Sequence, residues 1–380
     1  MEFDFDTPIQ RGASDSLKWG RYAGRDVLPL WVADMDFASP PAVIAALHKR
    51  VEHGVFGYAE PWPSLIDAVV EGIARDHGWR IDADWLVWLP GIVTGFNVAC
   101  SVAGEPGDEV FTFTPVYPPF LSAPRHTGRR LVRSDMRRED GRWTFDWDDV
   151  SQKITERTRM LLLCSPHNPI GRVYDHQEVF RLAAIAEQHD LLICSDEIHA
   201  GLVLDPLRPH IPIAALDDAV ARRTITLMAP SKTWNVPGLF CGFAIIPDPT
   251  LRRRYVAAMQ GIVPHANVLG LVAAEAAYRD GDSWRQALLQ YLAGNARAVE
   301  AAVAGMPGLS MTPVEATYLA WIDCRQAGLE RPAAHFEAHG VGLSDGADFG
   351  MPGFVRLNFG CPRSTLDEAL RRMRAALPAG

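Results

Sequence analysis

The sequence predicts an α/β protein with a large, mostly parallel sheet and a smaller α+β unit at the C-terminal end. From about residue 40 onward, short apolar runs alternate with longer amphipathic stretches. This pattern is typical of βα units around a sheet that is buried on both faces. The chain has 380 residues, 48% of them hydrophobic, which is enough for two or three domains. After Pro307 the runs shorten and the helical stretches become fewer, which indicates a second architecture.

Three units are expected along the chain. Residues 1–40 are rich in turn formers and tryptophan, so they are predicted to be an irregular arm that packs with the small domain. Residues 41–280 are expected to form the large domain and residues 281–380 the small one. The predicted strands are residues 109–113, 130–134, 159–164, 191–195, 224–228 and 242–246, then 318–323, 341–344 and 354–358. The predicted helices are residues 92–103, 175–188, 251–259, 267–279 and 283–303, then 333–339 and 365–376.

Composition excludes several classes of protein. A formal net charge of -9 argues against a nucleic-acid binder, because neutralising phosphates needs a basic face. No apolar stretch reaches the roughly 18–20 residues that cross a bilayer. The six cysteines are scattered without C-x-x-C spacing, which favours free thiols in a reducing, cytoplasmic compartment. The sequence has no G-x-G-x-x-G, P-loop or H-E-x-x-H motif, so no nucleotide or metal site is expected.

Polar residues follow three consecutive predicted strands where each strand ends. Asn168 follows the strand at 159–164, Asp196 the next strand and Lys232 the one after it. Each residue alone has an ordinary explanation: a turn, a helix cap and a solvated lysine, respectively. Ligands of open α/β sheets bind beyond the carboxyl ends of the strands, so the three together predict an active site there.

These motifs and three further segments carry a family resemblance. Asn168-Pro169-x-Gly171, Asp196-Glu197-Ile198-His199 and Ser231-Lys232-Thr233 resemble the fold-type I pyridoxal 5′-phosphate (PLP) enzymes of the aminotransferase class I/II superfamily. Within it, the segments Trp31–Phe37, Pro115–Phe120 and Arg356–Pro362 are similar to the MalY/PatB group of cystathionine β-lyases, which are C–S lyases. The match runs from about residue 30 to about residue 365 and implies a PLP-dependent transferase-like fold and PLP as the cofactor.

The resemblance implies a role for each residue around the cofactor ring. Lys232 is expected to hold PLP as a Schiff base and then to remove the substrate Cα proton, which requires a neutral amine. Asp196 is expected to keep the ring nitrogen protonated. Asn168 and His199 are expected near the phenolic oxygen of the ring, and Tyr117 is expected to stack on the ring. On the residues alone, His199 is also consistent with a buried histidine bonded to backbone.

The resemblance also places the phosphate and the substrate. The amides of Ile92 and Val93, at the start of a predicted helix, are expected to bind the phosphate together with Ser231. Tyr58 is expected to reach the same site from a partner subunit and to act in catalysis with Lys232 and Tyr117, which implies a homodimer with shared active sites. Arg356 is expected to grip the α-carboxylate of an amino-acid substrate. The segments near Trp62, Trp234 and residues 345–353 are candidates for the remaining pocket walls.

Two departures from the aminotransferase pattern favour a lyase. Aminotransferases commonly have a phosphate-binding serine three residues before the lysine and an arginine eight residues after it, and Ala229 and Phe240 stand there instead. We therefore expect β-elimination from L-cystathionine or another S-substituted cysteine, giving a thiol such as homocysteine, pyruvate and ammonia. The alternatives are a class I/II aminotransferase and, less favoured, a mainly regulatory protein that binds a transcription factor.

Overall fold

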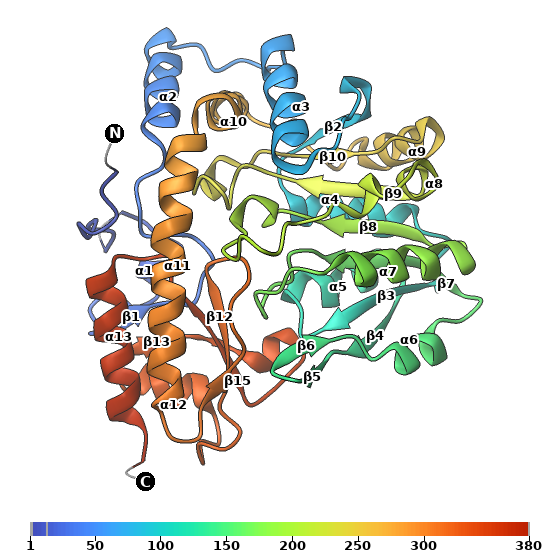
Figure 1. The fold of residues 1–380 in the computed structure, drawn as a ribbon. Coiled ribbons are helices and arrows are strands. Elements are labelled where there is room, and N and C mark those ends of the chain that lie inside the picture. Colours follow the sequence, from blue (N-terminus) through green and yellow to red (C-terminus); the bar gives the residue numbers. More distant parts are fainter. Residues whose placement is uncertain (1–2, 13, 379–380) are drawn as a thin grey trace.

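A large sheet forms the centre of the protein (Figure 1). The computed structural model describes residues 3–12 and 14–378. Neighbouring strands in the large sheet are parallel except around β10, which is antiparallel to both of its neighbours. In the described residues the order is β2 (Leu86–Leu89), β10 (Gly242–Ile245), β9 (Thr224–Met228), β8 (Leu192–Asp196), β7 (Thr158–Cys164), β3 (Glu109–Thr114) and β4 (Arg130–Asp135). The predicted mostly parallel sheet is confirmed, with β2 as an additional strand.

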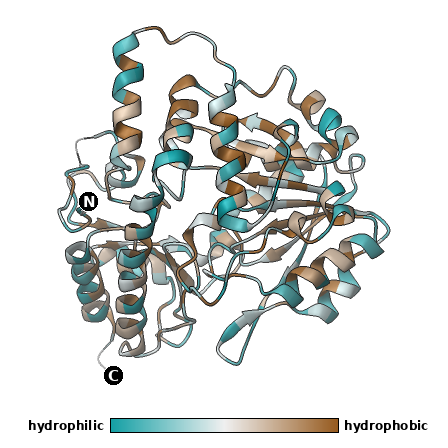
Figure 2. Cartoon of the chain, turned by 45° about the horizontal axis from the view of Figure 1, so that its top comes forward, coloured by the Kyte–Doolittle hydropathy of each residue, from teal (hydrophilic) through white to brown (hydrophobic). Residues whose placement is uncertain are grey.

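The central strands are buried on both faces, which explains their continuous apolar runs. Along β7, Met160 and Leu162 pack into one hydrophobic cluster, whereas Leu161 and Leu163 pack into another. Figure 2 shows that the middle of the sheet is predominantly hydrophobic, whereas the helices carry both hydrophobic and hydrophilic residues. The cluster with Met160 is covered by α4 (Ile92–Val102), α5 (Pro118–His126) and α9 (Pro249–Met259), and the cluster with Leu161 by α6 (Trp147–Lys153), α7 (His176–Gln188) and α8 (Asp218–Arg222).

Three helices form a further layer beyond the β2 end of the sheet. α2 (Pro41–His53) and α3 (Pro63–His77) both pack against α10 (Val268–Asp280). The predicted helices do not include α2 and α3, although both have recognisable ends. Each begins with proline in its first turn and ends at a glycine with positive φ, Gly54 at 75° and Gly78 at 64°. None of the helices in the described part of the chain is long and apolar enough to span a membrane.

The C-terminal part forms a second, antiparallel sheet. Its strand order is β11 (Ser310–Met311), β12 (Leu319–Asp323), β15 (Phe354–Asn358) and β14 (Ser344–Asp345). α11 (Asp282–Ala304) runs from α10 to this sheet (Figure 1), and α12 (Pro332–Ala338) and α13 (Arg363–Ala376) lie beside it. The predicted helices from residue 283 onward are thus confirmed to within two residues at either end. The division into domains at residue 280 falls between α10 and α11 and stays a prediction.

The single strand predicted at residues 341–344 is wrong. The chain changes sheets there: β13 (Val341–Gly342) pairs with β1 (Leu28–Pro29) of the arm, whereas β14 pairs with β15. Leu343, between the two short strands, is buried, so an uninterrupted apolar pattern conceals the change. A hairpin of β5 (Arg137–Glu139) and β6 (Arg142–Thr144) also lies outside the predicted strands.

The arm is irregular apart from β1 and the single turn of α1 (Leu17–Gly20). Asn235 lies three residues after Lys232, in the segment that follows β9, and holds the arm by three side-chain hydrogen bonds. The Asn235 side chain accepts a hydrogen bond from the Met35 amide (3.0 Å) and donates to the carbonyls of Met35 (3.0 Å) and Phe37 (2.8 Å). The backbone of Asn235 has φ 55°, a conformation that asparagine tolerates better than most residues.

Replacing Asn235 is therefore expected to loosen the arm. Asn235→Ala removes three hydrogen bonds and places an alanine at positive φ, so we expect the free energy of unfolding to fall by about 2–4 kcal/mol. Asn235→Gly loses the same hydrogen bonds without the backbone strain and should cost less. Urea unfolding followed by circular dichroism compares the two variants. Equal stability of both variants and the parent would contradict the assignment of Asn235 as a fastening point.

Candidate active site

A pocket of about 750 Å³ lies at the edge of the large sheet where its parallel strands end. β2, β3, β7, β8 and β9 are mutually parallel, so their carboxyl ends face the same edge. The residues that follow these five strands line the pocket, and so do other predicted site residues. The lining includes Ile92, Val93, Tyr117, Asn168, Asp196, His199, Ser231, Lys232 and Arg356.

Lys232 places its amine inside this pocket. Its Nζ donates a hydrogen bond of 2.6 Å to the carbonyl of Ala33 in the arm. Burial, followed by the charge of Arg356, lowers the pKa of the Lys232 amine to about 8, while Asp34 and Asp196 act in the opposite direction. A lysine with this pKa has a substantial neutral fraction near neutral pH, as a nucleophile or a base requires.

Asp196 and His199 are both buried in the neighbourhood of Lys232. Burial raises the pKa of the Asp196 carboxyl to about 7. One Asp196 oxygen accepts a hydrogen bond from the Ile198 amide (3.1 Å), and no cationic side chain of the described residues forms an ion pair with the carboxylate. Burial, with the charges of Lys232 and Arg356, lowers the pKa of His199 to about 3, so its ring is neutral. The His199 Nδ1 is buried without a hydrogen-bond partner in the described structure.

Arg356 points from β15 of the C-terminal sheet toward the end of β7. Its guanidinium donates to Asn168 Oδ1 (3.0 Å) and to the Trp31 carbonyl (2.7 Å), and it lies 4.7 Å from the centre of the Phe349 ring. Burial lowers the pKa of Arg356 to about 10, so the group is still a cation at neutral pH. No carboxylate in the described part of the chain lies within ion-pair distance, and the Nε has no partner there. The guanidinium is therefore suited to an external carboxylate.

The N-terminus of α4 forms part of the pocket lining. Gly91 caps this helix without a side-chain hydrogen bond, and a Cβ at Gly91 would meet nothing within 4 Å. The amides at the start of α4 have no partner within the helix, and the helix dipole favours an anion there. Ser231 also lines the pocket, and Tyr117 begins α5 on its wall. Burial raises the pKa of the Tyr117 hydroxyl, which keeps the ring neutral.

Tyr58 is the predicted site residue that a single chain does not bring to the pocket. It lies between α2 and α3 and its side chain is fully exposed. Of the candidate wall segments, residues 345–353 contribute Asp348 and Phe349. The segment around Trp234 contributes Ser231, Lys232 and Pro237, although the Trp234 side chain itself is buried against Tyr278. The Trp62 indole donates to Glu275 and does not line the pocket within one chain.

The arm contributes groups that the site prediction does not include. The carbonyls of Trp31 and Ala33 accept hydrogen bonds from Arg356 and Lys232, and the Trp31 side chain lines the pocket. The hydroxyl of Ser344 donates to the Trp31 carbonyl (2.9 Å), and Tyr318 donates to that of Ala33 (2.8 Å). The segment Trp31–Phe37 carries the family resemblance, but backbone carbonyls have no side-chain signature from which their contacts could be predicted.

Comparison with known proteins places this pocket in a family. The model of the family "Aminotransferase class I and II" matches residues 25–373. The chain belongs to the aminotransferase class I and II family. One relative is cystathionine beta-lyase PatB of Bacillus subtilis. It is 35% identical to this chain, and the alignment covers 98% of this chain and 100% of PatB. The crystal structure of OvoB has a TM-score of 0.97 at 47% identity and covers 100% of both chains. Cystalysin from Treponema denticola, which contains a pyridoxal 5′-phosphate cofactor, has a TM-score of 0.95 at 32% identity and covers 99% of both chains.

Membership of this family implies PLP as the cofactor, and the residues that line the pocket fit PLP. The Lys232 amine suits the aldehyde of PLP, and the buried Asp196 carboxylate, which has no cationic partner in the described residues, suits a protonated ring nitrogen. His199 offers a neutral ring whose buried Nδ1 has no partner in the described structure. The start of α4 and Ser231 suit the phosphate. The pocket volume is also in the range of cofactor and ligand sites.

Asp196→Asn is expected to raise the dissociation constant for PLP at least about tenfold, because a neutral amide cannot form an ion pair with the ring nitrogen. Titration of the cofactor-free protein with PLP, followed by absorbance, measures the constant. Asp190→Asn is a matched control, since Asp190 is exposed and precedes the amino end of the same strand, β8. Equal PLP affinity in both variants and the parent would contradict the role of Asp196.

Proposed function

We propose that this protein is a PLP-dependent C–S β-lyase that cleaves L-cystathionine, or a related S-substituted cysteine, to a thiol such as homocysteine, pyruvate and ammonia. The observation that carries the proposal is the meeting of Lys232, Asp196 and Arg356 in one pocket. The relationship to PatB supports the reaction, since that protein is named a cystathionine beta-lyase. PLP, when bound, withdraws electrons from the Cα of an amino acid joined to it and so makes the Cα proton removable.

Lys232 is the proposed base that takes the Cα proton. Its lowered pKa, about 8, lets the amine be neutral at a pH where an exposed lysine would be charged. The same property suits Lys232 to bind the cofactor aldehyde. Asp196 remains acceptor-only when ionised, so it can hold a proton at the ring nitrogen by forming an ion pair with it.

Arg356 is the proposed anchor for the α-carboxylate of the substrate. Asn168 and the Trp31 carbonyl fix the guanidinium from two sides, so a carboxylate bound to it is held in one orientation. Arg356 and Lys232 line the same pocket and donate to two carbonyls of the arm, those of Trp31 and Ala33, that are only two residues apart. A substrate anchored at Arg356 therefore lies in reach of the base.

The choice of β-elimination over amino-group transfer rests on the residues around the phosphate. Phe240 lines the pocket and Ala229 is buried, and neither side chain has a donor that could bind a phosphate. A site that holds the phosphate by α4 and Ser231 alone within one subunit differs from the aminotransferase pattern. An aminotransferase remains the second candidate, because it shares the first steps and the same family.

Purified enzyme loaded with PLP is expected to release pyruvate from L-cystathionine without any added keto acid. Lactate dehydrogenase coupling measures the pyruvate. Lys232→Ala should reduce the rate by at least about a thousandfold, because it removes both the base and the attachment point. The same variant should lack the visible absorbance band of lysine-bound cofactor.

Two results would count against this proposal. Turnover that depends on an added keto acid and gives no pyruvate would identify an aminotransferase. A Lys232→Ala variant with an unchanged visible band would show that another residue binds the cofactor. Lys49→Ala is the matched control, because Lys49 is an exposed residue of α2 and does not line the pocket.

We further propose a homodimer in which Tyr58 of the partner subunit completes the site. In one chain, the region around the α2–α3 connection exposes a group of apolar and aromatic side chains. Clusters of this kind favour burial against another protein surface. A second subunit would also supply the phosphate contact that Ala229 and Phe240 do not. The exposed residues are Val51, Val55, Phe56 and Tyr58.

Mixing two inactive variants tests the shared site. Tyr58→Ala and Lys232→Ala dimers are each expected to have little activity, whereas their mixture after subunit exchange should regain about a quarter of the parent activity. In a heterodimer one of the two sites receives both native residues. Sedimentation should show a dimer throughout. A mixture no more active than its components would contradict a site shared in this way.

We also propose a cytoplasmic location. All six cysteines are unpaired and buried, as expected for a protein kept in a reducing compartment.

A further inference from the structure

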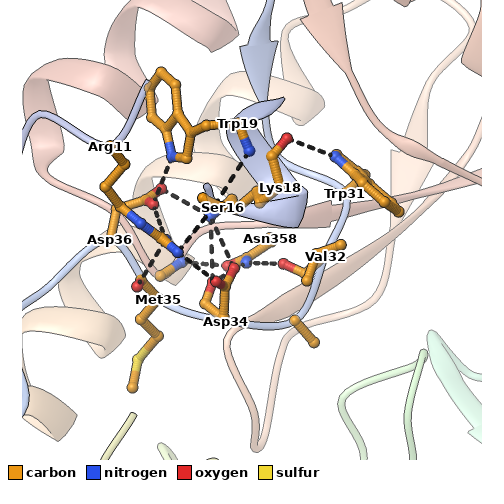
Figure 3. A network of polar contacts seen from close by, with 12 residues as sticks. Arg11, Ser16, Lys18, Trp19, Trp31, Val32, Asp34, Met35, Asp36 and Asn358 are labelled. Atoms are coloured by element: carbon orange, nitrogen blue, oxygen red, sulfur yellow. Dashed lines mark hydrogen bonds and ion pairs between the residues drawn. The ribbon is translucent and has the colours of Figure 1, made fainter. Parts of the chain in front are cut away.

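A largely buried cluster of charged side chains lies in the arm and includes Asp34 and Asp36 of the loop of residues 31–36 (Figure 3). Arg11 binds Asp36 (2.6 Å) and Asp34 (2.7 Å) with its two terminal nitrogens. Lys18 Nζ lies 2.7 Å from Asp36 Oδ2 and 3.8 Å from Asp34 Oδ1, and the Trp19 indole donates to Asp36 Oδ1 (2.9 Å). Two cations thus face two carboxylates. Lys18 is 1% exposed and Asp36 is 4% exposed.

Such a cluster specifies a position more than it stabilises the fold. Withdrawing charged groups from water is costly, most of all for Lys18 and Asp36, and their mutual attraction roughly offsets that cost only in a well-defined geometry. Lys18 adds two backbone contacts to its ion pairs: its Nζ donates to the Asp34 carbonyl (3.2 Å), and its own carbonyl accepts from the Trp31 indole (3.2 Å). Lys18 therefore holds the loop near both of its ends.

The held loop presents its carbonyls to the active site. Ala33 O accepts from Lys232 Nζ (2.6 Å), and Trp31 O accepts from Arg356 Nη2 (2.7 Å). Asn358, two residues beyond Arg356, donates to the carbonyls of Val32 and Asp34. A shift of the loop would consequently move the hydrogen-bond acceptors of both the lysine and the arginine.

We infer that Lys18 is a positioning residue of the active site: through Asp34 and Asp36 it holds the loop of residues 31–36 against Lys232 and Arg356. The inference rests on the proposed function, because it concerns the two residues that the function assigns to the cofactor and to the substrate carboxylate. Lys18 does not line the pocket, so it acts through the loop.

The charge of Asp34 gives this role an electrostatic consequence. Asp34 Oδ1 is buried and accepts no hydrogen bond from the described residues. Its charge raises the pKa of Lys232, with Asp196, against the effect of Arg356. His199 also faces Lys232 and is neutral. On the other side, Lys18 faces the two carboxylates, Arg11 and the Cys361 thiol. Removal of Lys18 leaves Asp34 less compensated, so its effect on Lys232 should grow.

The test is a pH titration of the visible absorbance of PLP bound to the protein. In Lys18→Met the midpoint should move up by about one pH unit, because the less compensated carboxylate favours the protonated form of the lysine nitrogen. Asp34→Asn should move it down by a similar amount, and the fold is expected to tolerate this change because Lys18 keeps Asp36. Lys49→Met is the matched control and should leave the midpoint unchanged.

A second measurement needs neither cofactor nor substrate. Amide hydrogen exchange of residues 30–37 in the cofactor-free protein should be faster in Lys18→Met than in Lys49→Met, since the loop is less well held. A Lys18→Met protein that is less stable but has the parent's midpoint and exchange would overturn the inference. Equal midpoints in Asp34→Asn and the parent would also overturn the inference. This comparison decides the question if Lys18→Met does not fold. If the protein does not cleave L-cystathionine, the proposed function is wrong. Both measurements can still be made, because neither depends on turnover of a substrate.

Discussion

The contact between Arg356 and Asn168 joins the two sheets of this protein at the place where its chemistry is expected. Arg356 comes from the antiparallel C-terminal sheet and Asn168 follows the central strand β7 of the large sheet. Both side chains are buried, so a hydrogen bond between them offsets part of the cost of withdrawing their polar groups from water. This closure brings residues of both sheets around the pocket that contains Lys232, and it helps to orient the guanidinium of Arg356.

Closure has opposite effects on the ionisable groups that it buries. Withdrawal from water disfavours charge, so it lowers the pKa of Lys232 and raises that of Asp196. Without a cofactor, an amine and a carboxyl of nearly equal pKa face the same space. A protonated ring nitrogen beside Asp196 would restore the charged carboxylate, while Lys232 would stay able to react. The chain's own electrostatics are thus those of a site suited to a cation-bearing cofactor.

Much of this arrangement can be predicted from the sequence, because strand ends are local features. The apolar runs before Asn168, Asp196 and Lys232 define β7, β8 and β9, and parallel neighbours bring their ends together. The arm contacts could not be predicted in this way, since they are made by backbone carbonyls and by residues far apart in the chain. The change of sheet at Leu343 was hidden by its burial, and the role proposed for Tyr58 depends on a second subunit.

The arm also determines when the site can form during synthesis. The carbonyl of Trp31 meets Arg356 across 325 residues of sequence, and β1 pairs with β13 near the other end of the chain. A ribosome must therefore release nearly the whole polypeptide before residues 28–31 find these partners. The large sheet can assemble earlier, with its reactive lysine still open to solvent. Completion of the active site is consequently a late, long-range event.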